Sequence, residues 1–484
     1  MNNGVPRIFG QPRTRRDVLR AAGMAAVAAG LGGTAACASE ENPVVDPGAT
    51  GDEPKLTFEE PASKLSGDLK ILLWSHFVPS HDTWFDKFAK AWGEKVGVNV
   101  VVDHVDQAEI HTRIAAEIQA GEGHDVIQYI ATLSQYEPSV LDMKDLVEEA
   151  SSRWGEQLDL CRKSSFNPAT GKFYAYSPGW VPDPGNFRKS LWAPVGLPNG
   201  PSTWDELLEG GAEIKKSQHV QMGLGMSQEI DSNMVTRALM WSFGASEQDE
   251  HEQVVLNSPE TVAAVEFMAR LYKDTMTPEV FSWNAASNNQ GMAAGKLSYI
   301  VNSISAWRTA QEQGTTAGDS DVPISDDIFF VKALKGPKAA LAAQHVLYNW
   351  IVPKHAKGVD AAKEFLLHYT ANFAQATYNS KLYDFSAWSK LTPDVGDWLA
   401  KDPFGAKPAD KLKILTDAVP WSANIGYPGP SNTAIGEIYN TFVIPNMFAR
   451  AARGEATPEQ AVAEAEGQVK AVFDKWRTAG LIGG

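Results

Sequence analysis

The sequence predicts a two-lobed α/β protein. The chain has 484 residues, which is too long for one compact core, so two lobes of ordinary size are expected. Three short apolar runs, residues 69–74, 98–105 and 125–130, are typical of buried strands. Between them lie segments with helical periodicity, residues 82–92 and 108–120. Strands that alternate with helices at this spacing indicate parallel pairing and a layered α/β lobe.

Further helices and strands are expected along the rest of the chain. Thr203 and Glu206 fit a capping box, in which the threonine accepts the amide of Glu206 and the glutamate reaches back. Proline follows Ser258 and Thr457, as it does at the first position of many helices. The other expected elements are a short helix at 186–192, a strand end at 301–307, one β-like run at 342–352, and helices at 357–369, 435–452 and 458–476. Four tryptophans in these helices or their caps are expected in the core: Trp84, Trp92, Trp204 and Trp476.

The first 36 residues predict an export signal. Arginines lead, and residues 21–36 are small, apolar and uncharged, which is the layout of a secretory signal. This run is too short for a membrane span, which needs about 20 apolar residues. Arg15 and Arg16 resemble the twin-arginine address, and GTAAC, ending at Cys37, resembles a bacterial lipobox whose cysteine is acylated. The alternatives are an ordinary cleaved signal with an incidental cysteine, or a short buried helix.

The segment that follows Cys37 predicts a flexible tether. Residues 37–66 are rich in proline, glycine, serine and acidic residues and have few large apolar side chains. Such a composition cannot bury enough apolar surface to fold alone. We therefore expect residues 37–66 to link an anchored cysteine to the folded body, outside the cytoplasm.

The composition excludes several classes of partner. Hydrophobic residues make up 43% of the chain and charged residues 21%, as in ordinary globular proteins. The formal net charge is −16, and about −20 without residues 1–36. Such an acidic surface argues against nucleic acid and against a basic membrane-binding face. Cys161 is the one cysteine besides Cys37, so no internal disulfide is expected when Cys37 carries lipid.

Motifs of catalysis and metal binding are missing from the sequence. It contains no G-x-x-x-x-G-K-[ST], no G-x-S-x-G and no H-E-x-x-H. The pairs His76/His81 and His104/His111 are five and seven residues apart, which supports a zinc site only weakly. We therefore expect no metal, no cofactor and no catalysis. A secreted glycosidase with two carboxylates across a cleft is the alternative, although the acidic runs at 249–252 and 326–327 lie in polar stretches.

The order of several segments resembles a known family. The export signal and acidic tether are followed by ILLWSHFVPSHDTWFDKFAKAW, HDVIQY, FRKSLWAPVGLPNGPSTWDEL, IVNSISAW and VDAAKEFLLHYT, with two closing helices. This order resembles the extracellular solute-binding lipoproteins of bacterial ABC transporters, carbohydrate type. The resemblance implies a periplasmic-binding-protein-like (type II) flytrap fold, with lobes joined by three crossings near residues 176–178, 344–348 and 385–389. It places lobe 1 at 67–177 and 348–386, and lobe 2 at 178–347 and 387–484.

Aromatic and polar residues at strand ends and lobe crossings are the candidate ligand-binding residues. In open α/β sheets ligands lie outside the carboxyl ends of strands. Aromatic faces stack on the C–H faces of sugars, and amides, hydroxyls and imidazoles bind the sugar hydroxyls. For each candidate the alternative is a core position. The candidates are Trp74, Ser75, His76, Gln107, Gln128, Tyr129, Trp180, Asn302, Trp307, Tyr348, Asn349, Trp350, Trp421 and Tyr427.

Within this set we expect Trp74 and Tyr129 of the first lobe to face Trp307 and Trp421 of the second across the ligand. The expected function is a monomeric receptor that delivers a sugar or polyol to the permease subunits of an ABC importer. A choline-type or glycerophosphodiester ligand is the alternative, because aromatic faces also attract quaternary ammonium groups. A secreted carbohydrate-active enzyme is the further alternative.

Overall fold

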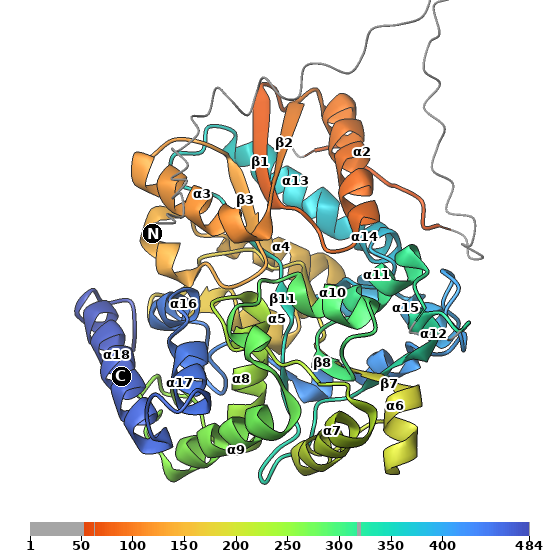
Figure 1. The fold of residues 1–484 in the computed structure, drawn as a ribbon. Helices are drawn as coiled ribbons and strands as arrows, with labels where there is room; N and C mark the ends of the chain where they lie inside the picture. The colour runs from red at the N-terminus through yellow and green to blue at the C-terminus, as the bar shows by residue number, and fades with distance from the viewer. Residues whose placement is uncertain (1–52, 62, 317–320, 484) are drawn as a thin grey trace, which may run out of the picture. The chain divides into compact units, whose positions relative to one another are not determined.

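The computed structural model describes residues 53–61, 63–316 and 321–483 (Figure 1). The predicted export signal, Cys37 and the first part of the predicted tether lie outside the described residues. Within the described part of the chain, no helix is long and apolar enough to cross a membrane.

The first lobe is built on a four-stranded sheet with the order β12-β3-β1-β2. Its strands are β1 (Asp68–Trp74), β2 (Asn99–Val105), β3 (Val126–Tyr129) and β12 (Asn349–Ile351). β1 runs parallel to β2 and β3, which confirms the parallel pairing predicted from the sequence. β12 returns from much later in the chain and pairs antiparallel with β3.

Helices of the first lobe pack through aromatic side chains. They are α2 (Pro79–Val96), α3 (Gln107–Ala120), α4 (Lys144–Trp154), α5 (Asp159–Lys163), α13 (Val359–Ala371) and α14 (Phe373–Asn379). Phe88 and Trp92 of α2 meet Phe365 of α13, with ring centroids 5.6 and 5.2 Å apart. Gly97 ends α2 with a φ of 79°, a left-handed conformation that suits glycine. The buried face expected from the aromatic periodicity is confirmed.

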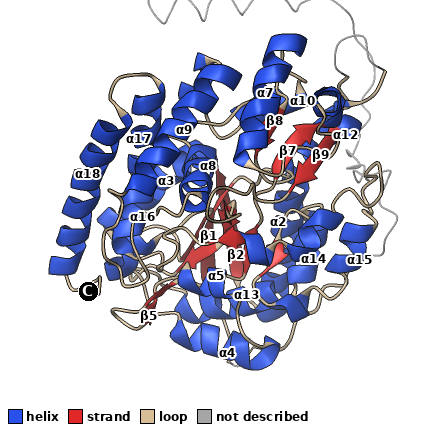
Figure 2. Ribbon diagram, turned by 90° about the horizontal axis from the view of Figure 1, so that it is seen from below, coloured by secondary structure: helices blue, strands red, loops and turns tan. Residues whose placement is uncertain are grey.

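The second lobe has its own sheet, with the order β8-β7-β9 (Figure 2). Its strands are β7 (Gly185–Arg188), β8 (Tyr299–Val301) and β9 (Ile328–Val331), and β7 pairs antiparallel with both neighbours. The remaining helices of the described chain are α6 (Lys189–Trp192), α7 (Trp204–Gln218), α8 (Ile230–Ser242), α9 (Pro259–Thr275), α10 (Ser287–Ala293), α11 (Ser305–Gln313), α12 (Ile324–Asp327), α15 (Val395–Ala400), α16 (Thr433–Asn440), α17 (Val443–Ala452) and α18 (Pro458–Thr478).

Three short strands from the expected crossings form one further sheet. They are β6 (Gly179–Val181), β11 (Val346–Leu347) and β13 (Phe385–Ser386), in the order β11-β6-β13. β6 pairs antiparallel with both β11 and β13. Segments that lie near residues 180, 346 and 385 are thus held side by side by backbone hydrogen bonds. Because this sheet joins the three crossing segments, they form a single connection between the two lobes.

Small strands and single turns complete the described part of the chain. The strands are β4 (Phe166–Asn167) with β5 (Lys172–Phe173), and β10 (Ala342–Ala343) with β14 (Ser422–Ala423). The 3₁₀ turns are η1 (Ser134–Ser139), η2 (Ala193–Val195), η3 (Pro278–Phe281), η4 (Ser389–Leu391), η5 (Lys413–Asp417) and η6 (Val419–Trp421).

Several element predictions were wrong in detail. Residues 186–192 are the strand β7 and the short helix α6 instead of one helix, and residues 342–352 divide among β10, β11 and β12, each in a different sheet. The predicted helix at 435–452 is two helices, α16 and α17. Phe442 separates them with a left-handed φ of 56°. Pro445 lies in the first turn of α17, where its missing amide breaks no helical bond.

The helix caps largely follow the prediction. Thr203 accepts the Glu206 amide at 3.0 Å, but the Glu206 carboxylate binds the amide and hydroxyl of Ser202 instead of reaching Thr203. Ser258 caps α9 through the amide of Thr261. A complete capping box is present at the start of α18, between Thr457 and Gln460.

The described end of the predicted tether packs on the first lobe. The amide of Thr57 donates to Asn372 Oδ1 at 2.8 Å, and Asn372 Nδ2 donates to the Thr57 carbonyl at 2.7 Å. The ring of Phe58 lies 5.6 Å from that of Phe88, and Leu65 is buried. This part of residues 37–66 is therefore bound to the folded body, where the composition predicted a free segment.

Candidate functional site

Sequence-predicted residues meet at the carboxyl ends of β1 and β3. The two strands are parallel neighbours, so their carboxyl ends point to the same edge of the sheet. Trp74 ends β1 and His76 follows it, while Tyr129 ends β3. β12 runs antiparallel to β3 and pairs Trp350 with Gln128. Predicted residues from separate segments of the chain therefore lie in one region of the first lobe.

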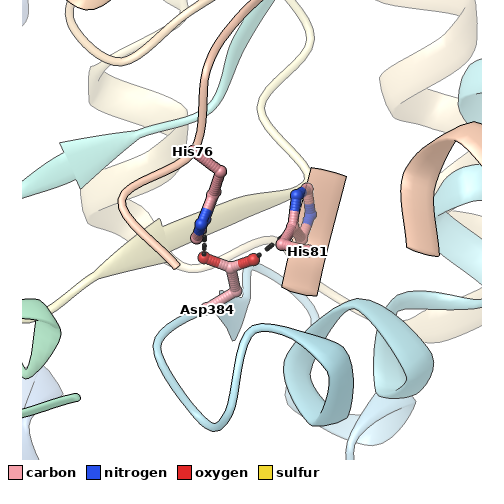
Figure 3. Close-up of side chains that lie close together, drawn as sticks. All are labelled: His76, His81 and Asp384. Carbon is pink, nitrogen blue, oxygen red and sulfur yellow. Dashed lines mark hydrogen bonds and ion pairs between the residues drawn. The ribbon is translucent and has the colours of Figure 1, made fainter. Parts of the chain in front are cut away.

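Beside this region His76, His81 and Asp384 form a buried group, which we call the histidine cluster (Figure 3). His76 Nε2 lies 3.3 Å from Asp384 Oδ1, and His81 Nε2 lies 3.5 Å from Asp384 Oδ2. The two imidazole rings stack with centroids 4.3 Å apart. The Tyr348 hydroxyl donates to Asp384 Oδ1 and lies 3.0 Å from His76 Nε2. The cluster joins the loop after β1, the start of α2 and the residue before β13.

In the histidine cluster, burial and the neighbouring groups shift the pKa of Asp384 in opposite directions. Burial alone would raise the pKa of Asp384, but the charge and hydrogen bond of His76, with His81 and Tyr348, outweigh it and hold that pKa below its ordinary value. Burial, with the neighbouring His76, lowers the pKa of His81. At neutral pH Asp384 is therefore ionised and the His81 ring is neutral.

A second buried group consists of Asp183, Asp231 and His345, which we call the carboxylate cluster. Asp183 follows β6, His345 precedes β11, and Asp231 lies in the first turn of α8. His345 Nδ1 lies 3.0 Å from Asp183 Oδ1 and 3.7 Å from Asp231 Oδ1. Among the described residues, Asp183 Oδ2 and Asp231 Oδ1 accept no hydrogen bond, while His345 Nδ1 is the one donor within reach of Asp183 Oδ1.

Burial and like charge act together in the carboxylate cluster. Burial raises the pKa of Asp183, although the nearby His345 opposes the shift. Burial, Glu229 and Asp183 raise the pKa of Asp231 well above its ordinary value. Glu229 caps α8 and accepts the amides of Asp231 and Ser232, at 2.6 Å each. Each buried acceptor left without a donor costs about 1–3 kcal/mol, so this cluster is held at a cost to stability.

Aromatic rings connect the two clusters. The Phe77 ring lies 5.0 Å from the Trp74 ring and 6.4 Å from the His345 ring. The Tyr383 ring lies 5.1 Å from His76 and 6.3 Å from His345. The Tyr383 hydroxyl has no hydrogen-bond partner among the described residues. We call Trp74, Phe77 and Tyr383 the aromatic frame. These three rings lie between the first-lobe loop after β1 and the crossing strands, near Asp231 of α8.

Trp307 lies apart from these groups, inside the second lobe. It belongs to α11 instead of a strand end, and its side chain is completely buried. Its Nε1 donates to the Ser325 carbonyl at 3.0 Å, and the Arg308 guanidinium lies 4.2 Å from the ring centroid. Phe330 meets it edge-on at 5.8 Å. This packing favours the core alternative for Trp307.

The other predicted aromatic residues also have packing partners. Trp421 ends the 3₁₀ turn η6 instead of lying in an irregular loop, and it is nearly buried. Tyr427 meets Trp241 edge-on at 5.6 Å. Trp180 of β6 tilts against Phe385 of β13 at 5.8 Å. Trp350 stacks on Phe85 of α2 at 6.0 Å, in the first-lobe core. Among the described residues, no ring contact joins Trp74 or Tyr129 to Trp307 or Trp421.

The predicted polar residues are placed as follows. Ser75 is exposed at the end of β1. Gln107 begins α3 and hydrogen-bonds Tyr129. Asn302 donates to Asn289 beside β8. Asn349 Nδ2 donates to the carbonyl of Ala131 at 3.3 Å.

Sequence reasoning missed Phe77, Asp183, Asp231, Tyr383 and Asp384, and His345 lies inside a segment that was named only as a crossing. Acidic residues in apolar crossings are the signal that was available. Asp183 stands between Pro182 and Pro184 directly after β6, and Asp384 directly precedes β13. A charge in such a place is expensive to bury unless it has a partner or a function.

Two surface cavities lie away from the histidine and carboxylate clusters. One, of about 700 Å³, is lined by Asp68, Lys70, Arg113 and Lys357, at the amino end of β1. The other, of about 720 Å³, lies in the second lobe between residues 196–202 and β9. Neither contains a sequence-predicted site residue. The first is at the opposite end of β1 from Trp74, and so at the edge of the sheet where ligands are not expected.

Comparison with solved structures shows the same fold. Maltose-bound MalE3 of T. maritima is 21% identical to this chain over 84% of it and 99% of the other, with a TM-score of 0.66. A sugar transporter of Arthrobacter chlorophenolicus A6 with bound laminaribiose is 17% identical over 84% of this chain and 99% of the other, with a TM-score of 0.68. A solute-binding protein of Agrobacterium radiobacter K84 in complex with ribitol is 15% identical over 86% of this chain and 100% of the other, with a TM-score of 0.66.

These likenesses confirm the two-lobed, periplasmic-binding-protein-like fold that the sequence predicted. No curated protein matches the chain by sequence. The family model "Bacterial extracellular solute-binding protein" matches residues 78–376, more than half of the chain. The matched residues include His81 of the histidine cluster and the whole carboxylate cluster, while the three rings of the aromatic frame lie just outside them. The chain belongs to the bacterial extracellular solute-binding protein family.

Proposed function

We propose that this protein is the solute receptor of an ABC importer and that it captures a sugar or polyol at the carboxylate cluster and aromatic frame. The observation that carries the proposal is that two buried carboxylate oxygens, Asp183 Oδ2 and Asp231 Oδ1, have no hydrogen-bond donor among the described residues. They lie where the first-lobe loop, the crossings and α8 of the second lobe meet. Proteins of the same fold are solved with maltose, laminaribiose and ribitol, which supports this ligand class.

The chemistry of the site suits hydroxyl groups. A carboxylate accepts strong hydrogen bonds, and two hydroxyls on neighbouring carbons match its two oxygens. A bound polyol would supply the donors that Asp183 and Asp231 lack, so binding would recover part of the desolvation cost of these groups. Phe77 and Tyr383 would contact the apolar C–H faces of the ligand, as aromatic rings do in polar ligand sites.

A cationic solute is the second candidate. The same excess of carboxylates beside aromatic rings suits a quaternary ammonium group, which ring faces and negative charge both attract. A choline-type ligand, or the choline group of a glycerophosphodiester, would use Asp183 and Asp231 as counter-charges instead of hydrogen-bond acceptors. The two candidates differ in salt dependence, because only the cationic ligand gains from long-range attraction that salt screens.

We further propose that the receptor has no catalytic activity. The family and the structural neighbours are binding proteins. In the carboxylate cluster both acidic side chains approach one nitrogen, His345 Nδ1, at 3.0 and 3.7 Å.

Export, anchoring and partners complete the proposal. Residues 1–36 would direct export by the twin-arginine route, and lipid on Cys37 would hold the receptor at the outer face of the cell membrane. The receptor would act as a monomer and deliver its solute to the permease subunits. The proposed lobes are residues 67–177 with 348–386, and 178–347 with 387–484. Cys37→Ser should release the protein from the membrane fraction; unchanged retention would contradict the lipid anchor.

A binding screen with the purified protein tests the proposed ligand class. Melting temperature is measured with maltose, laminaribiose, ribitol and choline esters at several salt concentrations. A ligand at 100 times its Kd stabilises the folded state by about 2.7 kcal/mol, which such a scan detects. Stabilisation by a sugar or polyol, independent of salt and without turnover, supports the proposal. Stabilisation by choline esters alone would replace it with the cationic candidate, and product formation from an oligosaccharide would overturn it.

A further inference from the structure

We propose that the histidine cluster, His76, His81 and Asp384, binds a divalent metal ion of the Zn²⁺ type. The three side chains offer donor atoms within 4.8 Å of one another, and all three are buried. They come from the loop after β1, from α2 and from the segment before β13, and they converge on one point (Figure 3). The sequence had predicted no metal, because the spacing of His76 and His81 alone is uninformative and Asp384 lies 308 residues from His76.

The donor atoms are close enough to share one ion after a local adjustment. One donor atom from each of the three residues lies within 4.8 Å of the other two. His76 Nε2 is 3.3 Å from Asp384 Oδ1, and His81 Nε2 is 3.5 Å from Asp384 Oδ2. Two ligands at about 2.0–2.1 Å from Zn²⁺ lie roughly 3.4 Å apart when the angle between them is tetrahedral. Because the two imidazoles face different oxygens of Asp384, the side chains would rearrange so that one ion lies between all three.

Some of these donor atoms also have no hydrogen-bond partner among the described residues. Both ring nitrogens of His81 and Oδ2 of Asp384 have no hydrogen-bond partner among the described residues, although both side chains are more than nine-tenths buried. A buried acceptor without a donor is unfavourable, and a cation between His81 Nε2 and Asp384 Oδ2 would give both of these atoms a partner. The nitrogen of a neutral imidazole and a carboxylate oxygen are ordinary zinc ligands.

The surroundings of His76 suit a metal ligand. Its Nδ1 lies 2.9 Å from the Val78 amide nitrogen and 3.1 Å from the Val78 carbonyl oxygen. Nδ1 accepts from the amide when Nε2 carries the proton, and it donates to the carbonyl when Nε2 is free for a metal, which is the tautomer of zinc-bound histidine. Tyr348 lies beside the same site, with its hydroxyl 3.0 Å from His76 Nε2. Tyr348 or a water molecule would fill the fourth position.

The size of the site favours a structural ion. A cavity of about 10 Å³ adjoins the cluster, and it is lined by Leu73, Trp74, His76, His81, Asp82, Phe85, Gln128, Tyr348 and Trp350. Such a volume admits about one water molecule, so no substrate reaches the ion. The ion would tie the loop after β1 and the start of α2 to the third crossing. It would thereby hold Trp74 and Tyr383 of the aromatic frame in place.

Metal binding is tested with the purified mature chain, independently of any solute. The protein is treated with chelator, and Zn²⁺ is then titrated by calorimetry while metal content and melting temperature are measured. We expect about one Zn²⁺ per chain and a higher melting temperature than in the chelated protein. His81→Gln should weaken Zn²⁺ binding by roughly 100-fold or more, since it removes a direct ligand. Zn²⁺ that neither binds nor raises the melting temperature would overturn the proposal.

A matched control is His368→Gln. His368 is buried like His81, but its nitrogens lie 2.8 and 3.1 Å from the carbonyls of Glu364 and Glu59, outside the cluster. It should keep wild-type Zn²⁺ affinity; equal loss in both variants would overturn the assignment. Co²⁺ provides a second readout, because tetrahedral Co²⁺ absorbs visible light strongly. This absorption should appear in the wild type and disappear in Asp384→Asn, and its absence from the wild type would also count against the site. Neither readout depends on a solute, so failure here leaves the proposed function untouched.

Discussion

The histidine cluster and the carboxylate cluster are both buried, yet they balance charge in opposite ways. In the first, two imidazoles and a tyrosine hydroxyl surround one carboxylate, and the pKa of Asp384 is held below its ordinary value. In the second, one imidazole faces two carboxylates with a third nearby, and the pKa values of Asp183 and Asp231 are raised. Burial raises the pKa of a carboxyl in both places, so the neighbours decide the outcome.

This difference separates a structural role from a binding role. Asp384 Oδ1 is hydrogen-bonded to His76 and Tyr348, so removal of this carboxylate leaves two buried groups unsatisfied, although Oδ2 has no partner of its own among the described residues. Carboxylates that outnumber their partners destabilise the fold, and such a cost is retained where a ligand supplies what is missing. We therefore assign the histidine cluster to holding the first lobe to the crossing sheet, and the carboxylate cluster to solute binding.

The largest expected effect is on stability, in Asp384→Ala. The change removes the acceptor of the Tyr348 hydroxyl and the partner of His76 and His81. With about 1–3 kcal/mol lost for each buried group left unsatisfied, the free energy of unfolding should fall by roughly 3–5 kcal/mol. Denaturant unfolding measures it. A loss below about 1 kcal/mol would mean that the histidine cluster is not a structural anchor.

Trp307→Ala and Phe77→Ala compare a core ring with a ring of the aromatic frame. Trp307→Ala should cost about 3–5 kcal/mol of stability while the remaining folded protein binds solute normally. Phe77→Ala should weaken solute binding by roughly 3–10-fold, equivalent to about 0.5–1.5 kcal/mol, with a smaller loss of stability. Calorimetry and melting temperature together decide. Weakened solute binding in Trp307→Ala, with an unchanged melting temperature, would show that Trp307 contacts the ligand.

Asp231→Asn should raise the melting temperature. The change removes a buried charge that faces Glu229 and Asp183, so the free energy of unfolding at neutral pH should increase by about 1–2 kcal/mol. Thermal unfolding without solute measures it. Asp397→Asn is the control, since Asp397 lies on α15, away from the cluster. A lower melting temperature for Asp231→Asn would show that the carboxylate is well satisfied, which contradicts the contrast drawn between the clusters.

The smallest expected effect is on the pH dependence of the stability difference between Asp231→Asn and the wild type. The folded-state pKa of Asp231 lies above its unfolded value, so its favourable contribution is fully present below the unfolded pKa and is lost as pH rises through the folded pKa. The groups that face it are Glu229, Asp183, His345, Tyr383 and Tyr439. The stability advantage of Asp231→Asn should therefore shrink from neutral pH down to about pH 4. An advantage that grows on acidification would reverse the assigned sign.

Local patterns predicted the fold better than the site. The alternation of strands and helices at 69–130 placed β1, α2, β2, α3 and β3 correctly, because hydrophobic periodicity is read from neighbouring residues. Tyr348 and His76 were both singled out, and they do meet. Asp384 reaches them from a crossing segment that is distant in the sequence, which no periodicity reports.

The rule of aromatic residues at strand ends also selected side chains of the core. Trp307 follows β8 closely, but α11 begins at Ser305 and turns the ring into the second lobe, toward Phe330. Ring size favours burial as much as ligand stacking, so an aromatic residue alone does not mark a site. A buried acidic residue in an apolar crossing, such as Asp183, is the more informative signal, since its burial is costly without a partner.

The most direct test is the affinity of Asp183→Asn for the solute that stabilises the wild type most in the screen. Asp183 Oδ2 has no donor among the described residues, and Oδ1 has only His345 nearby, so we expect the Asp183 carboxylate to be the main acceptor for the ligand. Hydrogen bonds to a charged group contribute about 1.5–3 kcal/mol, and calorimetry should therefore show binding weakened by roughly 10–100-fold. The melting temperature of the variant without solute should be equal to or above that of the wild type. Unchanged affinity in the folded variant would contradict the account and move the solute away from the carboxylate cluster.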